Sequence, residues 1–195
     1  MKKHLEAAIN PAMIVVGAVL LRLIPHVPNF APIGAIGLFG GVYLNKKYAV
    51  LVLFAALVIS DYLLLYVNPF SPSPIDFSRI YSPLSLVHTT TVFVYLSFFI
   101  YFMIGKWIAR NKNFGTVVFG SLVGSILFFL ITNFGVWAVG MYSRSLDGLI
   151  TSYIMGLPFF RGTLFGDLFY TAVFFGGYEL VLRFVKKPEV ALAEK

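Results

Sequence analysis

The chain has 195 residues, of which 59% are hydrophobic and 12% are charged, and its formal net charge is +7. A soluble domain usually carries about 25% charged residues, so this composition argues against a water-soluble globule and indicates lipid around the protein. The absence of cysteine excludes disulfides, thiolate metal sites and a cysteine nucleophile. The lysines and arginines stand in short clusters between apolar runs, which is typical of charges that orient membrane helices and argues against nucleic acid as a partner.

The first apolar run resembles a signal peptide because Lys2 and Lys3 precede it. No cleavage site with small residues follows, and the run continues into Arg22, Pro25 and further apolar segments. We interpret it as a retained first span rather than as a removed targeting segment.

Apolar segments recur along the whole chain, and a helix needs about 20 apolar residues to cross about 30 Å of hydrocarbon. The sequence predicts an all-α, polytopic membrane helical bundle of six transmembrane helices in the bacterial cytoplasmic (inner) membrane, with residues 1–195 forming a single integral membrane domain. The predicted spans cover residues 11–24, 32–44, 48–67, 88–108, 114–139 and 162–184. The second span is short, which leaves open whether it crosses fully.

The distribution of basic residues supports six spans with both chain ends in the cytoplasm. In this arrangement every Lys and Arg lies inside except Arg22, Arg79, Arg144 and Arg161. The apolar segment 149–160 is too short to cross the bilayer, so we expect a short re-entrant or interfacial helix before the last span. A seventh span here would move the C-terminal basic cluster to the outside.

Polar side chains from five spans or their edges fall at a similar depth, on the outer side of the predicted bundle. An ionisable group at membrane depth costs several kcal/mol unless it is paired or wetted, so each is a candidate functional residue. Aromatic residues collect at the same level, and aromatic walls with a few placed polar groups are typical of a small-molecule pocket. The candidate binding residues are Arg22, His26, Asn29, Asp61, His88, Asn133, Trp137, Tyr153, Arg161, Asp167 and Tyr170.

We assign hypothetical roles to these residues in an outward-facing pocket for a small polar or amphipathic solute. The charged groups Arg22, Asp61 and Asp167 provide charge complementarity, and Asn29, Asn133 and His88 form hydrogen bonds. The aromatic rings of Trp137, Tyr153 and Tyr170 stack on the solute, and Arg161 stands on a lid segment. We expect no cofactor and no resident metal, because the spacing of His26, His88 and Asp61 is not diagnostic of a metal site.

Each of these assignments has a structural alternative. The outer aromatic residues also fit an interfacial belt. Arg22 could snorkel to the headgroups or pair internally with Asp61 or Asp167. Asn133 could hold helices together, and His88 could start a helix.

Glycines at a spacing of four occur twice, as Gly37 with Gly41 and as Gly120 with Gly124, and Gly34 can share the face of the first pair. Small residues at this spacing let helix backbones approach closely, either inside the bundle or at a docking face for a partner. The chain lacks a phosphate-binding loop and the HExxH and GxSxG signatures. We therefore expect no enzyme. A scaffolding protein of the cell envelope, or an enzyme acting on lipid headgroups, remains an alternative.

Four stretches carry a family resemblance, namely residues 23–41, 60–61, 132–137 and 156–168. They resemble an uncharacterised bacterial family of predicted transport membrane proteins. That family is similar in size and topology to the substrate-binding S components of energy-coupling factor (ECF) transporters. The resemblance implies a six-helix protein that captures a vitamin or other micronutrient from outside and docks on a transmembrane coupling protein with ATPase subunits.

Overall fold

The computed structural model describes residues 17, 20–24, 27–44, 46–67, 75 and 87–193. Within them lie α3 (Ile33–Tyr43), α4 (Lys46–Leu64), α5 (Thr91–Ile108), α6 (Phe114–Ala138) and α7 (Leu146–Ala193). The only extended pairing in this part of the chain is one isolated bridge between Val67 and Ile75, so the all-helical class is confirmed there. Most of the predicted first span, and His26, lie outside the described residues.

The ends of α6 follow directly from local sequence. Asn113 accepts a hydrogen bond from the backbone N–H of Thr116 at 2.9 Å, and the Thr116 hydroxyl accepts one from Asn113 N–H at 3.0 Å, which makes a capping box. At the other end Gly140 adopts φ +85°. Its N–H binds the Trp137 carbonyl at 2.9 Å, and Met141 N–H binds that of Val136 at 3.2 Å, as in a Schellman motif. The helix therefore occupies almost the predicted span.

The last helix differs from the prediction. We expected a separate short helix over 149–160 followed by a span over 162–184, whereas α7 runs unbroken from Leu146 to Ala193. At 1.5 Å per residue it is about 72 Å long. Pro158 removes one backbone donor inside α7, and packing of the preceding turns against α6 keeps the segment helical. The apolar segment 149–160 is therefore not a separate helix but the first part of a longer one.

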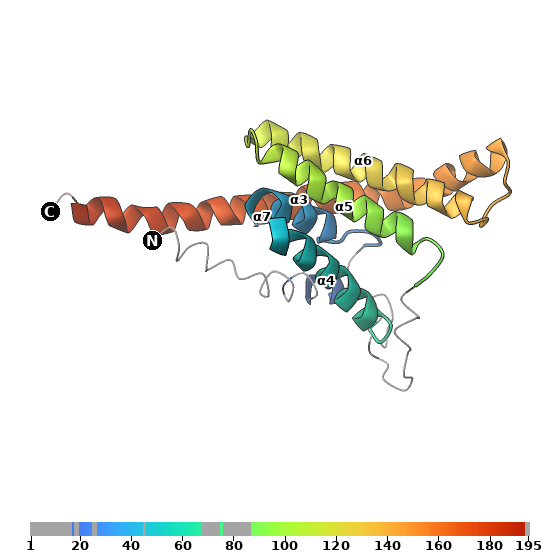
Figure 1. Ribbon diagram of the computed structural model, residues 1–195, viewed down its shortest axis with the longest axis horizontal. Helices are drawn as coiled ribbons and strands as arrows, with labels where there is room; N and C mark the ends of the chain where they lie inside the picture. The colour runs from blue at the N-terminus through green and yellow to red at the C-terminus, as the bar shows by residue number, and fades with distance from the viewer. Residues whose placement is uncertain are drawn as a thin grey trace.

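The described helices form a bundle in which α3 packs between α5 and α7, and α6 packs on both α5 and α7 (Figure 1). The α4 helix leans away from this group, and the C-terminal part of α7 extends beyond it (Figure 1). As a helix, α3 covers only about 16 Å, about half the thickness of a hydrocarbon core.

The glycine motifs lie inside the bundle. A Cβ atom added at Gly105 would lie 2.9 Å from Gly41 Cα, and one added at Gly120 would lie 2.6 Å from Ile108 Cδ1. An added Cβ at Gly124 would overlap the ring of Tyr101. These small residues let neighbouring helices touch, so they serve internal packing in the described part of the chain.

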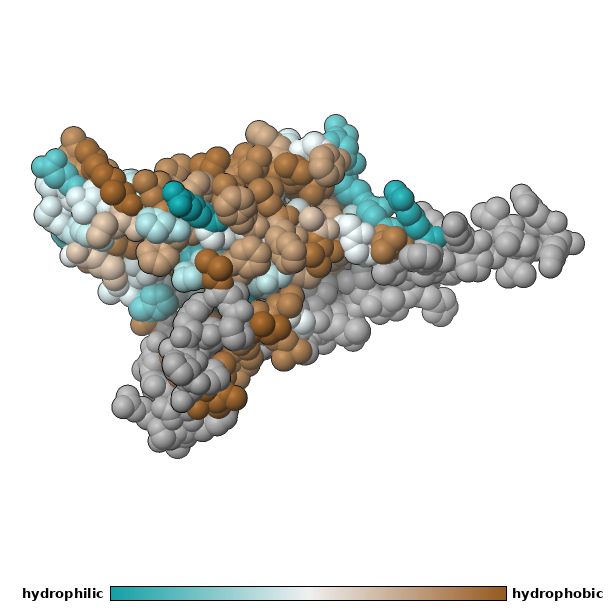
Figure 2. All heavy atoms as spheres, turned by 180° about the vertical axis from the view of Figure 1, so that it is seen from behind, coloured by the Kyte–Doolittle hydropathy of each residue, from teal (hydrophilic) through white to brown (hydrophobic). Residues whose placement is uncertain are grey.

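The exterior of the bundle is apolar, and its interior combines two clusters of packed apolar side chains with small polar ones. Hydrophobic residues predominate among the described residues on the face shown in Figure 2. On α5 the exposed apolar side chains form one outward stripe, consisting of Val92, Leu96, Phe99, Met103 and Trp107. The buried polar side chains include Ser60, Ser97, Ser121, Ser125, Ser152, Thr163, Asp167 and Thr171. Both α5 and α6 are long and apolar enough to span a membrane, and only 28% of the most apolar 18-residue stretch of each is buried.

Candidate solute pocket and buried polar clusters

A cavity of about 130 Å³ lies between α6 and α7, towards the end of α6. Two amides, two hydroxyls and four phenyl rings contribute to its wall, which is lined by Asn29, Phe128, Phe129, Thr132, Asn133, Gly156, Phe159, Phe160 and Thr163. None of the lining residues in the described part of the chain is charged. Such a wall can bind an uncharged group through hydrogen bonds and ring contacts.

The wall forms because α6 and α7 each present residues at helical spacing to the other. Gly156 is essential to this approach, since an added Cβ would overlap the side chain of Asn133. Asn133 Nδ2 donates to the Phe129 carbonyl at 2.8 Å, and Ser152 Oγ donates to the Asn133 carbonyl at 2.7 Å. These bonds orient the amide and fix the register of the two helices at the pocket.

Asn29 reaches the pocket from the turn that precedes α3. It adopts φ +62°, a left-handed conformation that Asn tolerates better than most residues. Phe30 N–H donates to the Val27 carbonyl at 2.9 Å within this turn. The turn lies directly on α7, because a Cβ at Gly162 would overlap the Pro28 carbonyl. Two predicted binding residues far apart in sequence, Asn29 and Asn133, are thus brought into one wall.

Asp167 lies deeper than we predicted, at mid-height in the bundle. Its Oδ2 atom accepts hydrogen bonds from the Tyr101 hydroxyl and, at 2.7 Å, from Ser125 Oγ. Asp167 is 3% exposed, and Ser125 lies near the middle of α6. The depth differs because α7 begins at Leu146 rather than at the predicted start of the last span. Asp167 is not among the residues that line the pocket.

Arg22 and Asp61 form a second polar cluster, between the segment 20–24, α4 and α5. Arg22 Nη1 lies 2.6 Å from Asp61 Oδ1, and it also donates to Ser60 Oγ. Tyr95 donates to Asp61 Oδ2 at 3.3 Å. The Arg22 and Asp61 side chains are 18% and 24% exposed. The internal pairing that the sequence left open as an alternative therefore occurs, and neither charge lines the pocket.

The other predicted binding residues have separate surroundings. Trp137 Nε1 donates to the carbonyls of Ser143 and Ser145, which fastens the turn before α7. The Tyr153 hydroxyl donates to the Leu130 carbonyl at 3.0 Å, and the Tyr170 ring packs 5.4 Å from that of Phe30.

The two remaining described residues lie away from the pocket wall. His88 is exposed in the turn that leads into α5, where its backbone N–H donates to Thr91 Oγ1 at 3.0 Å. Arg161 is exposed on the unbroken helix α7, so this part of the chain provides no separate lid segment.

Several residues of these clusters were missed by sequence reasoning. Tyr101 and Tyr95 stand in an almost wholly apolar run, which gives no sign of the face they occupy. Ser121 and Ser125 had a usable signal, since two serines four residues apart with Gly124 between them form one small, polar helix face.

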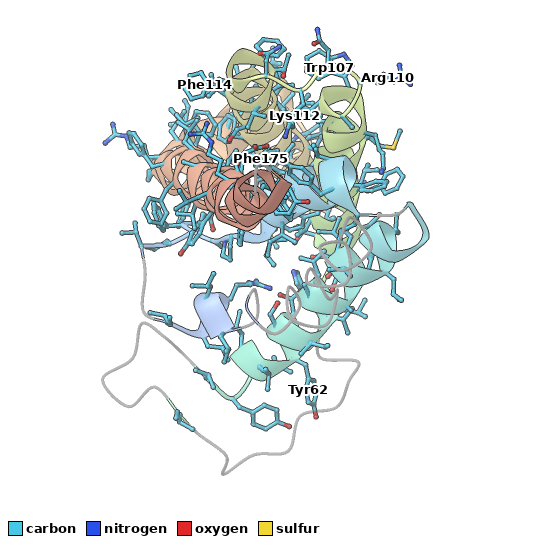
Figure 3. All side chains as sticks on the ribbon, turned by 90° about the vertical axis from the view of Figure 1, so that its left-hand side faces the viewer. Tyr62, Trp107, Arg110, Lys112, Phe114 and Phe175 are labelled. Carbon is cyan, nitrogen blue, oxygen red and sulfur yellow. The ribbon has the colours of Figure 1, made fainter. Side chains whose placement is uncertain are left out.

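A third polar cluster lies at the opposite end of the bundle from the pocket. Lys112 donates to Glu179 Oε1 and, at 2.7 Å, to the hydroxyl of Tyr43. Burial lowers the pKa of Lys112, but the hydrogen bonds to Glu179 and Tyr43 outweigh this and its pKa lies above the ordinary value. Figure 3 looks at this end and shows Lys112 directed between the helices and Arg110 directed away from them. Lys106 Nζ donates to the Leu44 carbonyl nearby, at 3.3 Å.

The described helices thus define an all-helical protein with an apolar exterior, an apolar core that contains buried polar groups, and a small neutral pocket. The chain belongs to a family of unknown function (DUF6580), which its residues 2–190 match. No curated protein and no solved structure matches the chain. The resemblance to an uncharacterised family is confirmed at this level, and the comparisons provide no link to S components of ECF transporters.

Proposed function

We propose that the protein is a multi-pass component of the bacterial cytoplasmic membrane that binds a small polar or amphipathic solute for uptake. The pocket between α6 and α7 is the binding site, and the six predicted spans with both ends inside form its topology. The observation that carries the proposal is the wall itself, in which Asn29, Asn133, Thr132 and Thr163 stand among four phenyl rings.

The distribution of apolar surface supports a membrane location. A water-soluble bundle directs its apolar side chains inward, whereas here the outward stripe of α5 is apolar. Besides apolar side chains, the interior holds hydroxyls and glycines, which are among the groups that pack helices against each other in lipid.

The distribution of basic residues supports an outward-facing pocket. Lys106, Arg110 and Lys112 follow one another around the α5–α6 turn, and Lys112 contacts Tyr43 and Glu179 there. Positive residues favour the cytoplasmic side, so the pocket, at the other end of α6, belongs to the outer side.

The size and chemistry of the pocket limit the range of solutes that it can bind. A cavity of about 150 Å³ takes up benzene, so about 130 Å³ accommodates a group of about six non-hydrogen atoms. Pockets for whole drug-sized ligands are about 300–1,000 Å³. The pocket therefore holds a small solute, or one ring of a larger vitamin whose remainder stays at the opening beside the exposed residues Asn29 and Phe159. The neutral wall favours an uncharged group.

Uptake needs an energy source, and the sequence contains no phosphate-binding loop of its own. In our proposal a transmembrane coupling protein with ATPase subunits supplies it, as in S-component-like transport. The support for this partner is the sequence resemblance alone. Affinity purification from the native membrane tests it, because recovery of the chain without any ATPase would refute this part and leave solute binding untouched.

A solute screen on the purified chain in lipid nanodiscs tests the binding site. We expect small heterocyclic or amide compounds to raise the thermal unfolding temperature, and Asn133→Ala and Thr163→Val each to weaken binding about tenfold, which corresponds to one lost hydrogen bond of about 1.4 kcal/mol. The matched controls Asn111→Ala and Thr151→Val change the same residue types outside the pocket. Equal affinity in pocket and control variants would place the binding site elsewhere.

A further inference from the structure

Asp167 is a buried ionisable side chain that the solute pocket does not use. Four helices enclose it, because α7 carries it, Tyr101 of α5 and Ser125 of α6 donate to it, and Gly34 of α3 packs against its Oδ1 atom. Ser125 Oγ also lies 3.0 Å from the Ser121 carbonyl, and Thr171 donates to Ser121 Oγ at 3.4 Å. Neutral hydroxyl groups thus lie on the carboxyl group and near it.

No cation balances this carboxyl group within the described part of the chain. The groups that face it are the phenol of Tyr101 from α5, the hydroxyl of Ser125 from α6 and the backbone of Gly34 from α3. The ion pairs found among the described residues join Arg22 to Asp61 and Lys112 to Glu179, and neither reaches Asp167. An ionised carboxylate in such surroundings costs several kcal/mol, which a bound proton removes.

We propose that Asp167 is a proton-binding site, protonated in this closed conformation and deprotonated when the helices separate enough to admit water. Oδ2 accepts from both hydroxyls, which leaves Oδ1 to carry the proton. A metal ion is not favoured instead, because no group of three or more His, Cys, Asp or Glu side chains that could hold one occurs among the described residues. On release the O–H bond breaks, its electron pair stays on Oδ1 and the proton passes to water.

The pocket and Asp167 are connected through side chains in contact. Thr163 lines the pocket one helical turn before Asp167. On the facing side the Phe128 ring of the pocket wall lies 5.2 Å from that of Phe98, which stacks 6.1 Å from the ring of Tyr101. A change in the pocket wall therefore reaches the phenol that holds the carboxyl group. This link, which rests on the proposed function, makes solute binding proton-dependent.

Infrared difference spectroscopy of the full chain in nanodiscs, without solute and near neutral pH, tests the proton site. Wild-type protein should show a protonated-carboxyl C=O band that Asp167→Asn removes. The same substitution at the ion-paired residue, Asp61→Asn, is the matched control and should leave the band in place. Tyr101→Phe keeps the carboxyl group, removes one hydrogen bond and should shift the band to higher wavenumber. A spectrum that Asp167→Asn does not change would overturn the proton site.

Solute affinity measured against pH tests the link to the pocket. In the proposed link the solute binds the pocket of the closed conformation, which holds the proton, so wild-type affinity should fall as pH rises, by up to about tenfold per pH unit for one coupled proton. Asp167→Asn, which imitates the neutral acid, should bind with an affinity independent of pH. An unchanged pH dependence in Asp167→Asn would overturn the link. Failure of every solute to bind would instead refute the proposed function. The infrared band would still show whether Asp167 is protonated, because that measurement uses no solute.

Discussion

Asp61 and Asp167 show two ways in which one protein accommodates a carboxyl group away from water. Asp61 is 24% exposed at its side chain and has the guanidinium of Arg22 at 2.6 Å. Asp167 is 3% exposed and has only neutral hydroxyl donors among the described residues. The first arrangement stabilises a charged carboxylate. In the second, burial without a cation favours the neutral acid, although the two hydroxyl donors by themselves favour the carboxylate. Identical substitutions at the two positions should therefore have different consequences.

Crowding the Asp167 cluster should have the largest effect. Gly34→Ala places a Cβ on the carboxyl group and within 2.9 Å of Tyr101 Cζ, so we expect a loss of about 3 kcal/mol in the free energy of unfolding. Gly176→Ala is the control on α7, because no heavy atom lies within 4 Å of its added Cβ. Denaturant unfolding in micelles measures both. Equal stability of the two variants would show that the cluster is loosely packed.

Replacing each aspartate with asparagine should distinguish the two sites. Asp61→Asn deprives Arg22 of its ionic partner, and we expect a loss of about 1–2 kcal/mol for this partly buried pair. Asp167→Asn exchanges one neutral group for another of the same shape, and we expect a change below about 0.5 kcal/mol. The same unfolding assay compares them. A larger loss at Asp167 than at Asp61 would mean that Asp167 is ionised in the folded protein.

The tyrosines beside the two carboxyl groups refine the comparison. Tyr101→Phe removes a donor from a fully buried oxygen and should cost about 1 kcal/mol. Tyr95→Phe removes a donor that lies 3.3 Å from a partly wetted oxygen already paired with Arg22, and should cost less than about 0.5 kcal/mol. Thermal unfolding midpoints of the two variants measure these losses. A loss for Tyr95→Phe as large as that for Tyr101→Phe would show that exposure does not govern the strength of these bonds.

The fold was predictable wherever a local signal fixes an element. Asn113 and Gly140 set the ends of α6, and the apolar lengths located α3, α4 and α5 within a few residues. The unbroken course of α7 was not predictable from length alone. The first part of α7 packs on α6, for example where Gly156 meets Asn133, and such a contact between two helices is not visible in the sequence of either one.

The contacts among the candidate residues were predictable only in part. Asn29 and Asn133 do share the pocket wall, and Arg22 does meet Asp61. The predicted depth of Asp167 was counted from the expected start of the last span at residue 162. Because α7 begins at Leu146 instead, the prediction placed Asp167 too close to the surface. Tyr101 carries no polar pattern in its own segment, so its role is visible only after the helices are packed.

The pair of Lys112 and Glu179 extends the comparison to charges that are exposed to water. Its coupling energy should be the smallest effect of those predicted here. Its side chains are 33% and 45% exposed, so water already solvates both charges. In a double-mutant cycle of Lys112→Met and Glu179→Gln we expect a coupling within about 0.5 kcal/mol that decreases as salt is added. Unfolding at low and high ionic strength measures it, and the Arg22–Asp61 pair should be less sensitive to salt because it is less exposed. If the Lys112–Glu179 coupling equalled that of Arg22 with Asp61, exposure would not explain the difference between the carboxylates, and the case for a neutral Asp167 would lose its physical basis.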